Sequence, residues 1–309
     1  MKIFLTGASG LVGAAFAKTA AQHGHEVTGI VGRHAGAIAG VAHQRSLDLS
    51  DVAALAAAVH AATPAAIVNC AAISEPAACD TDPVRSEALN VALPAELAQL
   101  AHRVGARLIH ISSEQVFDGT DTKAYRLTDA VNPINLYGHQ KLASERAVLA
   151  AAANSATVRA PLLMGDSPGG KRGLHERLFL GWSEGRPAKL YTDEYRQPCT
   201  AQNLADVLLE LTARPDLSGI FHWAGTELVS RHELGRRIRE HFKLSEARAP
   251  IIPVTRAETP EIAKGRQACL ALDLAPLAGT LRTKPQSLAE QLATLKVPPA
   301  LHAWAQGKG

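Results

Sequence analysis

Residues 2–13 read KIFLTGASGLVG, a short apolar segment that runs into three glycines spaced three residues apart. The apolar segment predicts a buried strand, and the residues after Gly10 predict a helix. Glycine at positions 7, 10 and 13 lets the backbone turn tightly, approach a ligand closely and pack the helix on the strand. The first amides and the dipole of that helix attract negative charge. This stretch therefore predicts a site for the pyrophosphate of a dinucleotide.

The chain alternates between apolar strand-like segments and alanine-rich helix-like segments as far as Pro161. Strands are expected at residues 3–5, 25–31, 41–45, 66–69, 107–111 and 156–159, and helices at residues 11–23, 51–62, 83–104 and 136–153. This alternation is typical of an α/β fold with a doubly wound parallel sheet. We expect residues 1–160 to form a dinucleotide-binding domain. Residues 161–309 should form mainly a smaller C-terminal substrate-binding lobe, with segments near residues 193–223 returning to the first domain.

The composition excludes several classes of protein. A chain of 309 residues with 47% hydrophobic residues can bury a large core, and a net charge of +3 is too small to favour a nucleic-acid partner. The four cysteines have no metal-ligand spacing, so we expect no metal site and a reducing, cytoplasmic location. Residues 52–73 carry no charge, but Pro64 divides them into two short elements. No membrane segment is expected.

Tyr137 and Lys141 place a phenol and an ammonium four residues apart, on one face of the expected helix. Ser112 and Ser113 follow the apolar run 107–111, at the edge of the sheet where parallel strands bind ligands. A tyrosine titrates near pKa 10 in water, and a neighbouring Lys141 with a positive nicotinamide ring would lower that pKa. The pattern favours acid-base chemistry at Tyr137 over a surface pair on an amphipathic helix.

Arg33 bears on the choice of cofactor. An NAD enzyme presents a carboxylate to the ribose 2′-hydroxyl after the second strand, but this sequence has Gly32, Arg33 and His34 there. A guanidinium suits a 2′-phosphate, so NADP is favoured and NAD is the alternative. The other interpretation of Arg33 is a solvated loop residue.

The chain resembles the extended short-chain dehydrogenases/reductases, and among them the dTDP-4-dehydrorhamnose reductase (RmlD-like) family. The resemblance covers most of the chain and lies in residues 6–13, 48–51, 68–72, 89–91, 111–119 and 132–138. It implies an NAD(P)-binding Rossmann fold in which Ser113, Tyr137 and Lys141 are catalytic. Together with the interpretation of Arg33, it implies a cofactor site made of Gly7, Ser9, Gly10, Leu11, Val12, Gly13, Arg33, Asp48, Leu49, Asn69, Cys70, Ala71, Ala72, Asn90, Ile111, Ser112, Tyr137, Lys141 and Pro161.

The resemblance also implies a nucleotide-sugar substrate, bound by Ser113, Glu114, Gln115 and Arg196. The expected activity is NADPH-dependent reduction of a nucleotide-linked 4-keto-6-deoxy sugar. Glu114 and Gln115 stand where these reductases carry Asp-Tyr, and residues 193–198 match only loosely.

Two other functions stay open. One is a nucleotide-sugar epimerase or dehydratase. The other is a non-catalytic, NADP-binding regulatory subunit similar to the methionine adenosyltransferase beta subunit, which residues 219–225 resemble. In similar proteins the helices at 83–104 and 136–153 pair across a two-fold axis, so a homodimer is expected.

Overall fold

β1 (Lys2–Thr6) lies inside a seven-stranded parallel sheet in the computed structural model, which describes residues 1–307. The sheet order is β11-β6-β5-β4-β1-β2-β3. The other strands are β2 (Glu26–Val31), β3 (His43–Ser46), β4 (Ala66–Asn69), β5 (Arg107–Ser113), β6 (Ser155–Ala160) and β11 (Gly219–His222). The winding reverses between β1 and β4, and ligands of such sheets bind outside the carboxyl ends of the strands at this point. The expected doubly wound α/β fold is confirmed.

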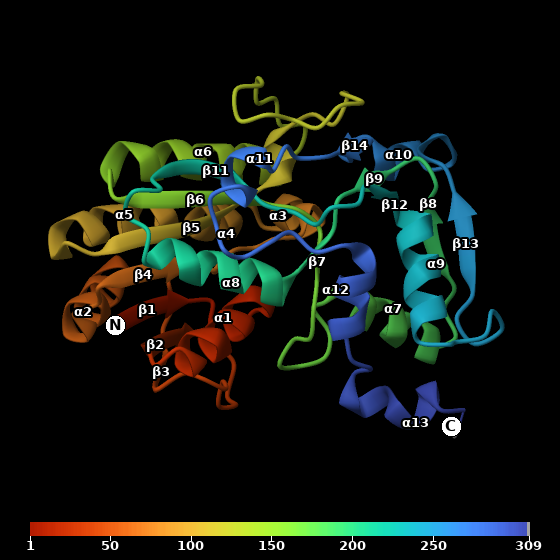
Figure 1. Ribbon diagram of the computed structural model, residues 1–309, viewed down its shortest axis with the longest axis horizontal. Helices are drawn as coiled ribbons and strands as arrows, with labels where there is room; N and C mark the ends of the chain where they lie inside the picture. Colours follow the sequence, from red (N-terminus) through yellow and green to blue (C-terminus); the bar gives the residue numbers. More distant parts are fainter. Residues whose placement is uncertain (308–309) are drawn as a thin grey trace.

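Helices cover both faces of the sheet (Figure 1). Alternate residues of β1 serve opposite faces, because Ile3 and Leu5 belong to one buried cluster and Phe4 to the other. α1 (Leu11–Gln22) and α8 (Ala201–Thr212) pack on the first face. α2 (Val52–Ala62), α5 (Leu93–Val104) and α6 (Leu136–Ala151) pack on the second.

The helix expected at residues 83–104 is not continuous. It consists of α4 (Pro83–Glu87), a π-helical turn η1 (Ala88–Ala92) and α5. The wider turn places Asn90 inside, where its side chain contacts the backbone of Ile73 and the amide of Gln140. A π turn inside a helix often marks a functional position.

A second lobe is built around another apolar cluster, which contains Phe179 and Trp182. Its main elements are α7 (Leu174–Ser183), β8 (Ala188–Tyr191), α9 (Arg231–His241), β13 (Ile251–Val254) and α12 (Leu288–Thr294). Five short strands lie between this cluster and the large sheet: β7 (Leu163–Met164), β9 (Tyr195–Arg196), β10 (Cys199–Thr200), β12 (Val229–Ser230) and β14 (Cys269–Leu270). They form two small sheets of their own, in the orders β10-β7 and β12-β9-β14. The remaining elements are α3 (Pro76–Thr81), η2 (Glu114–Val116), η3 (Arg256–Glu258), α10 (Pro260–Ala263), α11 (Ala275–Ala278), η4 (Pro299–Leu301) and α13 (His302–Ala305). That this lobe binds substrate stays a prediction.

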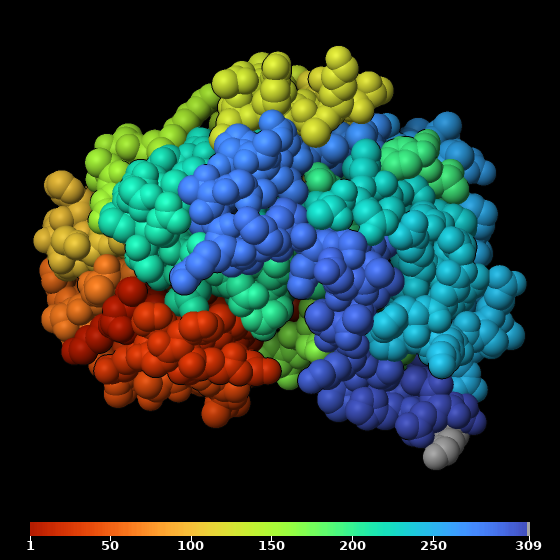
Figure 2. Space-filling view, in the orientation of Figure 1, coloured from red at the N-terminus to blue at the C-terminus, as the bar shows by residue number. Residues whose placement is uncertain are grey.

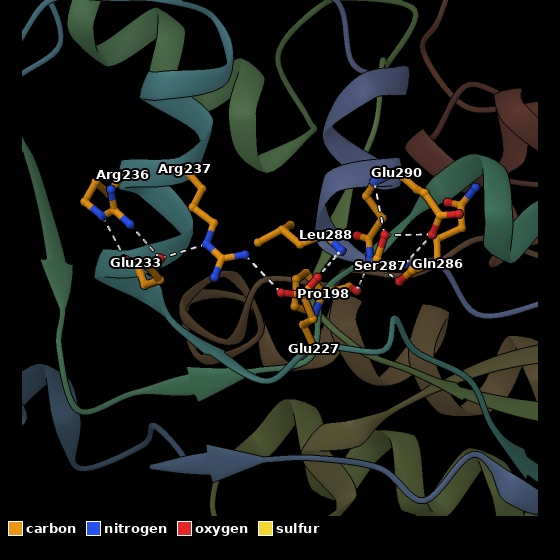
Figure 3. Close-up of polar contacts among 10 residues, drawn as sticks. Pro198, Glu227, Glu233, Arg236, Arg237, Gln286, Ser287, Leu288 and Glu290 are labelled. Atoms are coloured by element: carbon orange, nitrogen blue, oxygen red, sulfur yellow. Dashed lines mark hydrogen bonds and ion pairs between the residues drawn. The ribbon is translucent and has the colours of Figure 1, made fainter.

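Glu227 connects the helices of the second lobe. Figure 3 shows it between Arg237 of α9 and the start of α12. Its carboxylate accepts hydrogen bonds from the Arg237 guanidinium (2.9 Å) and from the backbone amide of Leu288 (2.7 Å). Gln291 of α12 in turn donates to the carbonyl of Pro198 (2.9 Å), which fixes the segment that follows β9.

Part of the C-terminal third also covers the sheet half. Residues 275–284, in blue, lie beside α8 in Figure 2. The Glu210 carboxylate of α8 accepts from the backbone amides of Arg282 (2.8 Å) and Thr283 (3.0 Å). Among residues 1–307, the structure contains no helix with the length and hydropathy that a membrane crossing needs.

Candidate active site

The glycine loop between β1 and α1 has room for backbone alone. Gly7 has a φ of 66°, and a Cβ there would lie 2.7 Å from the carbonyl carbon of Cys70. A Cβ on Gly13 would overlap the Gly7 carbonyl oxygen. Gly10 caps α1 without a side-chain hydrogen bond, and the first turn has no acidic residue. The loop leaves the positive end of α1 open to an anion, so it fits a dinucleotide pyrophosphate.

The structure brings the predicted cofactor residues to one edge of the sheet, at the carboxyl ends of the strands. Gly7, Ser9, Gly10, Leu11, Val12 and Gly13 follow β1; Arg33 follows β2; Asp48 and Leu49 follow β3; Asn69, Cys70, Ala71 and Ala72 lie at the end of β4; Ile111 and Ser112 lie in the last part of β5; and Pro161 follows β6. Tyr137 and Lys141 lie in the first turns of α6, and Asn90 lies in η1.

Asn69 and Ser112, like Asn90 in η1, have their side chains occupied within the protein. Asn69 accepts hydrogen bonds from the Thr6 hydroxyl (2.6 Å) and the Ala71 amide (3.2 Å), and its amide nitrogen lies 3.1 Å from His110 Nδ1. Ser112 donates to the Glu145 carboxylate (2.5 Å). These side chains shape the backbone around the crevice, so their contribution to a cofactor would come through that backbone.

Arg33 and Asp48 lie near each other on the outer part of this edge, and both are exposed. The Asp48 carboxylate accepts from the amide (3.0 Å) and hydroxyl (2.8 Å) of Ser50. These hydrogen bonds are the main reason why the pKa of Asp48 is lowered, and the charges of Arg85 and Arg33 add to the effect. Asp48 therefore remains a hydrogen-bond acceptor at neutral pH.

Ser113, Tyr137 and Lys141 are buried together behind this edge, with exposed fractions of 5%, 7% and 2%. Ser113 ends β5. Asn135 begins α6 by accepting a hydrogen bond from the Gly138 amide (2.8 Å), and this cap fixes the first turn that carries Tyr137. The two segments that sequence spacing placed at one site do meet there.

The pKa of Tyr137 differs from the expectation. Burial raises it above its usual value, and a hydrogen bond with Ser113 lowers it by less. The Lys141 ammonium lies 5.9 Å from the Tyr137 ring centre and donates to the Ile111 carbonyl (2.9 Å). Burial lowers the pKa of Lys141 to about 8. Tyr137 is thus a protonated phenol at neutral pH, the form that can donate a proton.

A buried ion pair supports β5 and α6 on the side away from the crevice. Arg159 of β6 makes two parallel hydrogen bonds of 2.8 Å to the Glu145 carboxylate of α6. The same carboxylate accepts from Ser112, so β5, β6 and α6 are held in one arrangement. A bidentate pair of this kind fixes geometry as well as charge.

Glu114 directly follows Ser113 in the sequence and is 3% exposed. One carboxylate oxygen lies 3.4 Å from Arg196 Nε, and the other is buried without a hydrogen-bond partner among the described residues. Burial raises the pKa of Glu114 to about 8, and it outweighs the nearby charges of Arg196 and Arg231, which lower it. The ion pair is therefore incomplete, and Glu114 can donate a hydrogen bond at neutral pH.

Gln115, also expected at the substrate site, has a structural contact. Its side-chain oxygen accepts from Asn135 Nδ2 (3.0 Å), and Asn135 also donates to the Gly265 carbonyl (2.9 Å). On the outer side lies a cleft of about 510 Å³ that includes Ile134, Tyr195 and Leu228. Ser113 and Tyr137 are not among the residues that line this cleft.

Glu194 and Arg266 were missed by the sequence analysis. Glu194 is 1% exposed and accepts two hydrogen bonds from the Arg266 guanidinium (2.6 and 2.8 Å). Arg196 and Arg231 lie 3.3 and 3.8 Å from the same carboxylate. Three arginines thus converge next to Glu114. The partners lie 72 residues apart, so no local spacing could have indicated them.

The whole chain up to residue 296 is similar to proteins of one known family. Residues 1–296 match the family described as RmlD substrate binding domain. The chain belongs to the RmlD family.

Relatives of this RmlD-family protein carry different names. It is 34% identical over 253 residues to methionine adenosyltransferase 2 subunit beta of Xenopus tropicalis, covering 79% of this chain and 72% of that protein. It is 31% identical over 237 residues to dTDP-4-dehydrorhamnose reductase of Mycolicibacterium smegmatis, covering 76% and 67%. A dTDP-4-dehydrorhamnose reductase from Bacillus anthracis, solved in complex with NADP, shares the fold with a TM-score of 0.79 at 19% identity, covering 94% and 96%.

Proposed function

We propose that this RmlD-family protein uses NADPH to reduce the keto group of a nucleotide-linked 4-keto-6-deoxy sugar. The observation that carries the proposal is the meeting of Ser113, Tyr137 and Lys141 beside the glycine loop. Arg33, with no acid next to it after β2, supports NADPH, and NADH is the alternative cofactor. The site would lie between the two halves of one subunit of a cytoplasmic homodimer.

A bound nicotinamide cofactor supplies the hydride. Gly7, Gly10 and Gly13 hold its pyrophosphate through backbone amides. Tyr137 donates its proton to the carbonyl oxygen of the substrate, because burial keeps the phenol protonated. Ser113 hydrogen-bonds the same oxygen as charge develops on it. Lys141, which donates to the Ile111 carbonyl, would hold the ribose of the cofactor, and its charge would favour transfer of the Tyr137 proton to the substrate.

Substrate recognition is assigned to the ionic cluster beside Ser113. Arg196 can pair with a phosphate of the nucleotide, although the Glu194 carboxylate already neutralises part of the local positive charge. Protonated Glu114 can donate to a sugar hydroxyl through the oxygen that has no partner among the described residues. Gln115 is assigned to the same recognition site, where Asn135 holds its side-chain oxygen and so fixes the side chain beside the sugar.

Tyr137→Phe tests the proton donor. The substitution keeps the ring and removes one hydroxyl, so folding and NADPH affinity should be unchanged. NADPH oxidation with dTDP-4-keto-6-deoxy sugars should fall by about 10² to 10⁴, the usual loss for a missing general acid. The rate is measured as the loss of absorbance at 340 nm, where the reduced cofactor absorbs and the oxidised cofactor does not. Tyr195→Phe in the outer cleft is the matched control and should keep the wild-type rate. Equal rates in wild type and Tyr137→Phe would contradict the mechanism.

A regulatory subunit is the second candidate function. Its support is the 34% identity to methionine adenosyltransferase 2 subunit beta, together with the Glu114 and Gln115 departures from the reductase pattern. It predicts NADPH binding without turnover and co-elution with the methionine adenosyltransferase of the same organism. An epimerase would instead convert the sugar nucleotide without net NADPH oxidation, so one assay with both readouts separates the three functions.

A further inference from the structure

Arg172 of the second lobe reaches the glycine loop. Two heavy atoms lie near the point where a Cβ on Gly10 would be: the Gly7 carbonyl oxygen at 3.0 Å and Arg172 Nη1 at 4.0 Å. The middle glycine of such a loop lacks a side chain so that a pyrophosphate can approach the backbone on this side. The guanidinium therefore borders the space that the pyrophosphate of a dinucleotide would enter.

The charges at this point are unbalanced. The N-terminus of α1 carries the positive end of the helix dipole, and its first turn contains no acid. Across residues 1–307, no hydrogen bond or ion pair engages the Arg172 guanidinium, whose side chain is exposed. A cation next to a positive helix end is unfavourable unless an anion lies between them, and a pyrophosphate supplies that charge.

The loop that carries Arg172 is held in place by Glu176, which is 2% exposed. Its carboxylate accepts hydrogen bonds from the amide and hydroxyl of Ser167 (both 2.7 Å) and from the amides of Arg172 (2.9 Å) and Gly173 (2.8 Å). Asp166 and His175 lie close enough to share a cation with Glu176, but these four bonds already use the carboxylate. The buried acid therefore serves to fix the backbone of Arg172.

A second contact crosses between the halves on the same side. Arg177 of α7 pairs with Glu75, which follows the turn after β4, at 2.6 Å. Arg172 and Arg177 thus both extend from the second lobe toward the nucleotide half. The first of these two guanidinium groups has no acid opposite it.

We propose that Arg172 binds the pyrophosphate of the dinucleotide from the second lobe and so completes the cofactor site. This inference rests on the cofactor site of the proposed function. It deepens that function, because a residue outside the first domain would then set cofactor affinity and draw the two halves together around the bound dinucleotide.

Titration calorimetry on three full-length proteins tests this: wild type, Arg172→Gln and Lys171→Gln. The probes are NADP⁺ and 2′-AMP, which lacks the pyrophosphate. Arg172→Gln should weaken NADP⁺ binding about tenfold, as loss of a charge-assisted hydrogen bond does, and should leave 2′-AMP binding unchanged. Lys171→Gln, the neighbouring exposed cation, should bind both as wild type does.

Three outcomes overturn the proposal. NADP⁺ affinity equal in wild type and Arg172→Gln would show that the guanidinium does not reach the pyrophosphate. Equal losses for NADP⁺ and 2′-AMP, or an equal loss in Lys171→Gln, would indicate a change elsewhere or a general effect of charge. If the wild type does not bind NADP⁺ at all, the cofactor site itself is refuted, and the proposed function with it.

Discussion

Glu114 shows how one buried carboxyl can matter at this site. It follows Ser113 directly and lies against Arg196, yet one of its oxygens has no partner among residues 1–307. Removing a carboxylate from water costs more than a single long ion pair returns, which is why its pKa is raised to about 8. The carboxyl is therefore protonated in the folded protein over a pH range in which it would ionise in the unfolded chain.

Glu114→Gln should change how stability depends on pH. Between the ordinary pKa of 4.5 and the raised pKa of about 8, the folded protein binds more protons than the unfolded chain. The free energy of unfolding of wild type should therefore fall as pH rises through this window, by at most about 1.4 kcal/mol per pH unit from this group. Glutamine does not titrate, so the variant should gain stability relative to wild type between pH 5.5 and pH 8.5, as measured by urea unfolding.

The control for this comparison is Glu246→Gln, an exposed acid of the second lobe. Its stability relative to wild type should change little between the two pH values, because surface pairs contribute little. Parallel pH profiles for wild type and Glu114→Gln would mean that Glu114 is ionised in the folded protein.

The positions of the candidate site residues were predictable where those residues are close in sequence or end an element. Tyr137 and Lys141 lie on one helix, and Ser113 ends one strand, so spacing alone placed them on elements that meet at the sheet edge. The Tyr137 pKa was not predictable, because it depends on how completely the residue is buried. Glu194 and Arg266 were not predictable either, since their pairing exists only after the second lobe has folded.

At the scale of elements, the start of α1 depends on close packing against the preceding turn. Gly13→Ala would place a methyl group against the Gly7 carbonyl oxygen and 3.0 Å from the Cα of Ala8. The helix must then move away from β1, so we expect a loss of about 1–3 kcal/mol in the free energy of unfolding, as in other overpacked sites. NADP⁺ affinity should fall as well, because the same shift displaces the amides of the loop.

Gly169→Ala is the matched control, since a Cβ there meets open space and the φ of Gly169 is not positive. It should leave stability unchanged or raise it by up to about 1 kcal/mol. Thermal unfolding and NADP⁺ titration of both variants make the comparison. A Gly13→Ala protein as stable as wild type would show that the helix can shift without cost.

The elements themselves followed the sequence pattern closely, and the differences have physical causes. β5 continues to Ser113 beyond its apolar run because the hydroxyl of Ser112 finds the buried Glu145 carboxylate. The helix over 83–104 is interrupted because the Asn90 side chain forms better hydrogen bonds inward than along a regular helix. The spacing of hydrophobic residues in β5 and in residues 83–104 gives no information about these hydrogen-bond partners.

For the whole molecule, a homodimer through α5 and α6 stays a prediction. The outward face of α6 presents Leu149, which is 43% exposed. Light scattering at micromolar concentration should give about twice 32.6 kDa, and Leu149→Glu should shift the mass toward one chain because a charge would have to be desolvated in the interface. Leu228→Glu, at a similarly exposed leucine (42%) of the second lobe, should leave the mass unchanged. A wild type of single-chain mass would contradict the dimer.

The return of α8 and β11 to the sheet limits how this chain can be divided. Both elements come after the first parts of the second lobe, yet Leu204 and Leu208 of α8 share a core cluster with Phe16 of α1. A protease cut at Lys171 would leave two fragments that each hold part of the same core, so they should remain associated without a covalent link. Residues 1–170 made alone would expose the apolar side of α1. The nucleotide half is therefore not a module that recombination or gene fusion could exchange at Pro161.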